Sequence, residues 1–303
     1  MHTFTIHKTK QTFSFPSTQE ELTAKQRIAF IRLILMYNAG IINMQALKHL
    51  LLKDLLNVKS SLTFKYFTPK NNQLAAGTNF FRLTELLDSF FIKENEKYSI
   101  NLEIPKQFIP HLKHKGKKFF GPDSGFADLT FFEFRTASYY FTQYVEKNSE
   151  PDLDRLIALL YRPGKSFWFF RKRMRKCNAI RRISVNADSN PFTLEKRAKF
   201  LSSLPFQIKY TILMYCAGSF AYMRNGCPEI DGKEINLERL YKNEPDSESI
   251  GMSGLLFSMA ESGIFGNIAE TDKQNIYTIL ARMYQLMLQD EEMKRKLKSN
   301  AQN

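Results

Sequence analysis

The chain has 303 residues, 43% of them hydrophobic, which supplies a full core for one large domain or two modest ones. Its formal net charge is +14, so nucleic acid, an anionic membrane surface and an acidic protein all remain candidate partners. It has three cysteines and no CxxC pair, which argues against a disulfide framework and against a zinc ribbon.

The first part of the chain shows no sign of export. Its opening residues alternate polar and apolar side chains and lack the apolar core of a signal peptide. The longest apolar run, residues 210–223, is shorter than the ~20 residues that a membrane span requires. We therefore expect a soluble protein that is made in a reducing cytoplasm and has no membrane span.

Residues 1–104 are predicted to be mainly α with a little β. The alternation over residues 3–15 predicts a strand or an extended arm. Either Ser17 with Glu20 or Thr23 with Gln26 can cap the helix that follows. Further helices are predicted from Asn43 and over residues 80–90, and residues 98–104 alternate like a strand.

Residues 105–120 have the composition of a basic linker, with two prolines, a glycine and five lysines. His111 and His114 have a spacing that can suit a metal. Because no cysteine or acidic ligand lies near them in the sequence, we favour a solvated loop.

The stretch over residues 121–163 is predicted to organise the rest of the chain. It opens with turn residues, and Thr130 followed by Glu133 fits a capping box. A strongly aromatic helix follows, Pro151 suits the first turn of a second helix, and Arg162 with the following Pro-Gly ends it. The ordinary interpretation is a helical hairpin in the core, and the alternative is an exposed interface.

Residues 164–182 form a basic-aromatic segment. Residues 165–182 hold eight basic side chains and no acidic one, beside four consecutive aromatic residues. Three interpretations stay open: a solvated loop, an interface for an acidic protein, and a nucleic-acid surface on which rings stack and guanidinium groups pair with phosphates. A P-loop is excluded, because Leu159 stands where its first glycine is required.

The rest of the chain is predicted to be helical, with an acidic loop region at residues 224–250. That region could dock the basic-aromatic segment of the same chain or of a second copy. Helices are predicted over residues 193–203, 206–223 and 252–260. A long helix is predicted to begin near Thr271 and to fray beyond Gln289.

No catalytic set is recognisable. The five histidines lack the context of a serine or cysteine nucleophile, and the carboxylates have no metal-ligand spacing. We therefore predict a protein that is not an enzyme and has no catalytic residues, no metal and no cofactor.

A resemblance is carried by the pattern GPD-x-G…LTF-x-EF…Y…Y…L-x-x-L-x-A-x-LYRP over residues 121–163. This pattern resembles a group of proteins encoded in bacteriophage and prophage tail modules, and residues 6–26 and 254–280 are similar to the same group. The LYRP ending is similar to small tail-assembly chaperones. The resemblance implies a role in building or forming a phage-type tail, in the bacterial host cytoplasm during synthesis and in the virion tail.

The sequence therefore predicts a mainly α, multi-helix protein with a few short strands near the N-terminus. Its regions are residues 1–104, the linker 105–120 and a helical domain 121–303. We expect non-enzymatic tail assembly or a structural role through contacts with other tail or virion proteins, or with itself as an oligomer. The alternative is a nucleic-acid-binding protein that uses residues 165–182. The predicted partner-binding residues are Phe131, Phe134, Tyr139, Tyr140, Arg162, Phe167, Trp168, Phe169, Phe170, Arg171, Arg173 and Arg175.

Overall fold

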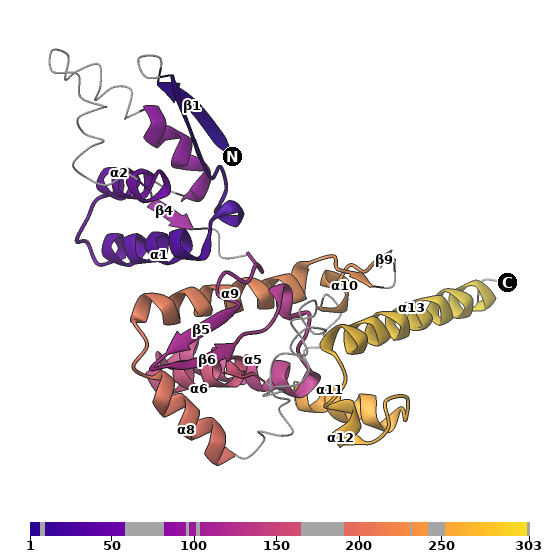
Figure 1. The fold of residues 1–303 in the computed structure, drawn as a ribbon. Coiled ribbons are helices and arrows are strands. Elements are labelled where there is room, and N and C mark those ends of the chain that lie inside the picture. The colour runs from indigo at the N-terminus through magenta and orange to yellow at the C-terminus, as the bar shows by residue number, and fades with distance from the viewer. Residues whose placement is uncertain are drawn as a thin grey trace, which may run out of the picture. The chain divides into compact units, whose positions relative to one another are not determined.

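The computed structural model describes residues 1–6, 10–57, 82–94, 97–100, 104–164, 191–230, 232–241 and 252–301. The chain divides into two compact units. Unit 1 comprises residues 1–104 and 205–214, and unit 2 comprises residues 105–204 and 215–303. Helices predominate and the strands form short antiparallel pairs (Figure 1), so the predicted mainly α fold class is confirmed. None of the helices in the described ranges combines the length and the apolar character that a bilayer crossing needs.

Unit 1 begins with the antiparallel strands β1 (His2–Ile6) and β2 (Gln11–Phe15). Phe4 lies opposite Phe13 in the register, and their rings stack with centroids 5.4 Å apart. Phe15, at the end of β2, is fully buried. The alternation of apolar residues over residues 3–15 therefore corresponds to a hairpin with one residue anchored in the core.

Two helices follow, α1 (Ala24–Asn38) and α2 (Met44–Leu55), with the single turn η1 (Gln19–Glu21) before them. Thr23 forms the capping box of α1 with Gln26, and Asn43 caps α2 by accepting from the N–H of Ala46 at 2.8 Å. Of the two caps considered for α1, the Thr23 cap is therefore confirmed. The Ser17 cap is wrong, because that side chain donates to Glu21 instead.

Unit 1 continues with the turn η2 (Leu86–Phe90) and the antiparallel strands β3 (Phe91–Glu94) and β4 (Lys97–Ile100). Phe90 is buried, and its ring meets that of Phe30 from α1 edge-on, with centroids 5.9 Å apart. The helix predicted over residues 80–90 is thus α-helical in its described part only up to Glu85 and then tightens.

Unit 2 contains a three-stranded antiparallel sheet of β5 (His111–His114), β6 (Lys117–Phe120) and β7 (Arg162–Pro163). The segment predicted as a linker, residues 105–120, therefore contains a β-hairpin. Its turn is Lys115-Gly116, with φ of 44° and 76°. Two successive positive φ values make the type of two-residue turn that matches the twist of antiparallel strands.

Unit 2 also contains the helices α5 (Phe131–Lys147) and α6 (Glu150–Leu160), which lie between β6 and β7 in the chain, and α8 (Pro191–Leu201) after β7. Helix α9 (Phe206–Asn225) begins in unit 1 and ends in unit 2. The predicted capping box of Thr130 and Glu133 is confirmed at the start of α5. Asn148 ends α5 in the left-handed conformation, and Pro151 lies in the first turn of α6. These two helices pack closely against each other, and α6 packs against α8.

The remaining elements of unit 2 are short, except for the last. They are η3 (Ser124–Phe126), β8 (Glu229–Ile230), β9 (Lys233–Glu234), α10 (Glu238–Tyr241), α11 (Met252–Glu261), α12 (Ile268–Thr271) and α13 (Ile276–Ala301). The long helix does not begin near Thr271 as predicted. The short helix α12, which Asn267 and Glu270 cap, ends at Thr271, and the long helix α13 begins at Ile276. Helix α13, yellow in Figure 1, also continues through its charged end to Ala301.

Candidate interaction surfaces

The predicted organising stretch is held by a buried ion pair between Glu133 of α5 and Arg162 of β7. The side chains are 3% and 4% exposed, respectively, and a guanidinium nitrogen of Arg162 contacts Oε1 of Glu133. The other carboxylate oxygen of Glu133 accepts the N–H of Thr130 at 2.8 Å. One carboxylate therefore joins the start of α5 to the strand that follows α6.

The start of α5 is also joined to the segment before α13. The N–H groups of Phe131 and Phe132 donate to the carbonyl oxygens of Gln274 and Asp272, at 2.8 and 3.1 Å. Arg135 binds Asp272 through two hydrogen bonds of 3.0 and 2.8 Å. These bonds satisfy two of the backbone donors that a helix N-terminus leaves without partners.

An aromatic cluster fills the interior behind these contacts. The ring of Phe220 from α9 lies 5.0 Å from Phe126, 5.5 Å from Phe134 and 5.0 Å from Phe141. Tyr215 meets Phe126 edge-on, and its hydroxyl donates to the carbonyl of Asp123 at 2.6 Å. Much of the high phenylalanine content of residues 121–163 thus serves the core, which is the ordinary interpretation of that stretch.

The predicted partner-binding residues divide into three groups. Phe131, Phe134 and Arg162 are buried and offer no area to a partner in this conformation. Tyr139 is 59% exposed on α5, and Tyr140 beside it is half-buried, with ring centroids 5.4 Å apart. The others lie outside the described residues: Phe167, Trp168, Phe169, Phe170, Arg171, Arg173 and Arg175. The docking of the acidic region onto the basic-aromatic segment stays a prediction for the same reason.

A second exposed apolar surface lies at α11 and α12, and we call it the α11–α12 patch. Phe257, Ile264 and Ile268 are 44%, 51% and 46% exposed. The first and third of them line an open pocket of about 690 Å³ together with Ala260, Glu261, Asn267 and Ala269. Sequence reasoning missed this patch because the run Gly-Ile-Phe-Gly at residues 263–266 indicates a turn, and it does not show which side of the turn faces solvent.

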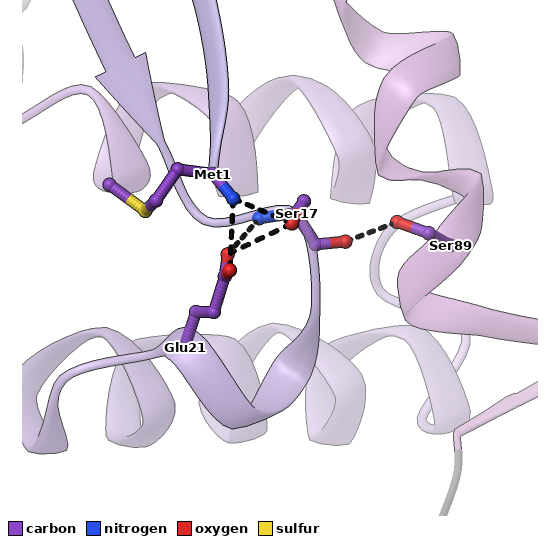
Figure 2. Close-up of polar contacts among 4 residues, drawn as sticks. All are labelled: Met1, Ser17, Glu21 and Ser89. Carbon is purple, nitrogen blue, oxygen red and sulfur yellow. Dashed lines mark hydrogen bonds and ion pairs between the residues drawn. The ribbon is translucent and has the colours of Figure 1, made fainter.

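Unit 1 contains the polar cluster that is drawn in Figure 2. The α-amino group of Met1 donates to Ser17 Oγ at 2.8 Å and to Glu21 Oε1 at 2.9 Å, while the N–H of Ser17 donates to the same carboxylate at 2.6 Å. Ser89 Oγ donates to the carbonyl of Ser17 at 2.7 Å. The hydrogen bond from the Met1 amino group, followed by that from Ser17, lowers the pKa of Glu21 to about 2. The cluster tethers β1 and η2 to the segment before α1, which is a structural role.

In the part of the chain that the structure describes, no group of three or more His, Cys, Asp or Glu side chains is placed to hold a metal ion. Burial raises the pKa of the Cys216 thiol and keeps it in the protonated, unreactive form. That the protein is not an enzyme stays a prediction.

Comparisons with protein-family models, with curated proteins and with solved structures find no match for this chain. The resemblance to tail-module proteins therefore stands on the motifs of residues 121–163 and of the two outer segments alone.

Proposed function

We propose that the protein is a non-enzymatic component of phage-type tail assembly that acts through protein–protein contacts. The α11–α12 patch is the observation that carries this proposal. Three large apolar side chains from a stretch of twelve residues are each about half exposed there, two of them beside an open pocket. Exposed apolar area of this kind costs free energy in a lone monomer and is typical of surfaces that a partner covers.

Two further features support the proposal. Tyr139 and Tyr140 add an aromatic pair on α5, and aromatic side chains are the usual anchors of protein interfaces. The motif resemblance points to tail or virion proteins, or to a second copy of this chain, as partners. Such a component works in the bacterial host cytoplasm while the tail is built, either as a chaperone or as a part of the finished tail.

Light scattering on nuclease-treated protein tests the proposal, alone and after co-expression with the other proteins of a tail module. We expect a discrete oligomer or a stable complex with one of them. The variant Phe257→Lys/Ile268→Lys places two charges in the α11–α12 patch and is expected to abolish that species. The matched control is Ile41→Lys/Ile92→Lys, since Ile41 and Ile92 are similarly exposed in unit 1.

Two results would contradict the proposal. One is a monomer that binds none of the co-expressed tail proteins. The other is an assembly that the control weakens as much as the α11–α12 variant does, because the contact would then not lie on this patch.

A further inference from the structure

The β5–β6 hairpin carries a concentration of positive charge that the assembly role does not use. We define the lysine hairpin as residues 111–120. Residues 105–120 contain five lysines and no aspartate or glutamate. Lys113, Lys115, Lys117 and Lys118 are all exposed. Every charged side chain that the hairpin exposes to solvent is therefore positive.

The strand register places like charges directly opposite each other. Lys113 pairs with Lys118, and the adjacent pair is His114 with Lys117. Side chains opposite each other in an antiparallel pair have Cβ atoms roughly 5 Å apart, and like charges at this distance destabilise the sheet. An uncompensated arrangement of this kind is typical of a functional site, where a local rule of stability is broken.

Several cations elsewhere in the described residues lie in ion pairs. Lys48 pairs with Asp88, Arg155 with Asp152 and Lys294 with Asp290. By contrast, none of the four hairpin lysines forms an ion pair with a carboxylate in the described ranges. Cations that lie within about 8 Å of one another reinforce their common field at physiological salt.

Aromatic rings hold the cations in place. The ammonium group of Lys118 lies 4.8 Å from the ring centroid of Phe120. Those of Lys117 and Lys115 lie 5.1 and 5.6 Å from Phe200 of α8. His114 meets the same ring edge-on and shares a hydrogen bond of 2.9 Å with Ser203 Oγ. The stems are thereby ordered on ring faces before any partner arrives, which lowers the entropy cost of binding.

We propose that the lysine hairpin binds the phosphate backbone of a nucleic acid. This binding does not depend on the assembly role proposed above. A protein partner fits the surface less well, because lysine is depleted at protein interfaces. In addition, none of the exposed large hydrophobic side chains in the described residues lies on the hairpin or on α8.

The composition of the hairpin surface favours nucleic acid over a membrane surface, because among the described residues none of the exposed large hydrophobic side chains that could insert into a bilayer lies on residues 111–120. Because side chains alternate along a strand, Lys113 and Lys118 lie on one face, Lys117 on the other, and Lys115 at the turn. The face of Lys117 also carries Leu112 and Phe119, which are buried, and β6 pairs with β7 along its other edge. Lys113, Lys118 and the turn therefore form the side of the hairpin that is open to a phosphate backbone.

Fluorescence anisotropy with labelled duplex DNA, single-stranded DNA and RNA tests the proposal on the full chain over a range of salt. We expect binding at low salt that weakens linearly in a log–log plot. The variant Lys113→Gln/Lys118→Gln is expected to lose about tenfold in affinity and to lower the salt slope by about two, one for each phosphate contact removed. Lys113→Arg/Lys118→Arg keeps both charges and is expected to keep the binding.

The matched control is Lys25→Gln/Lys53→Gln, which makes the same change in net charge at two exposed lysines of unit 1. We expect this control to bind nucleic acid like the parent protein. The melting temperature separates lost contacts from unfolding: removing two opposed charges should leave it unchanged or raise it, while affinity falls.

Three results would overturn the proposal. The first is that the parent protein binds none of the three probes at low salt. The second is that it binds phosphatidylserine vesicles more tightly than any of the nucleic acids. The third is an equal loss of affinity in the unit 1 control, because binding would then follow net charge and not the hairpin.

Discussion

At the scale of single residues, Glu133 joins local and distant structure. It closes the capping box of α5 through Thr130, and it neutralises Arg162, which lies 29 positions further along the chain. The first contact is predictable from a spacing of three residues. The second is not, because no local pattern shows which cation a carboxylate will meet in the core. Arg162 therefore resembled a surface anchor in the sequence and is buried in the structure.

The variant Arg162→Ala is expected to reduce the free energy of unfolding by about 3–5 kcal/mol, since it removes the Arg162 guanidinium from the buried Glu133 carboxylate. Urea denaturation measures the loss. Arg155→Ala is the control, because its pairs with Asp152 and Glu195 lie nearer the surface and should contribute about 1 kcal/mol or less. Equal losses for the two variants would show that the buried Glu133–Arg162 pair contributes no more to the free energy of unfolding than the ion pairs of Arg155.

Glu21 predicts a specific dependence of stability on pH. Its pKa in the folded protein is lowered from 4.5 to about 2, chiefly by the Met1 amino group. A carboxyl group whose pKa is lower in the folded than in the unfolded protein contributes its full stabilisation at pH values above the unfolded pKa. This contribution is lost as the pH falls through the folded pKa. The gap in melting temperature between the parent and Glu21→Gln should therefore narrow as the pH is lowered from 4.5 to 2. A constant gap across this window would contradict the assignment.

At the scale of elements, most helices could be predicted from the sequence, whereas the lysine hairpin of residues 111–120 could not. The helix at residues 206–223 and the caps at Thr23, Asn43 and Thr130 follow from periodicity and spacing. The hairpin at residues 111–120 was not predicted, for a physical reason. Lysines lie on both of its faces, so the alternation of apolar and polar residues that marks a strand is absent.

The cap of α5 gives a prediction at this scale. Thr130→Ala removes the oxygen that accepts the N–H of Glu133 at 3.3 Å and is expected to cost about 1 kcal/mol of unfolding free energy. Chemical denaturation monitored by circular dichroism measures it. Thr136→Ala, inside the same helix, should cost less, because alanine has the higher helix propensity there. A smaller loss at Thr130 than at Thr136 would contradict the role of the cap.

At the scale of the whole molecule, each compact unit is built from two separate stretches of the chain. The regions predicted from the sequence, residues 1–104, 105–120 and 121–303, are each continuous. Residues 205–214, however, belong to unit 1, although they form the first half of α9, which continues into unit 2 as one helix. Periodicity predicts a helix, but it does not show that the two halves of the helix belong to different units.

The contacts between the start of α5 and the segment before α13 also set the timing of folding during synthesis. The hydrogen bond from Tyr277 to the carbonyl of Gly125 joins residues 152 positions apart. A ribosome that adds about 5–20 residues per second needs roughly 8–30 s to make that interval. Until residues 272–274 are made, the N–H groups at the start of α5 bind water in place of their carbonyl partners. Until residue 220 is made, the aromatic face of α5 also lacks Phe220. The nascent chain should therefore be a client of ribosome-associated chaperones until α13 emerges.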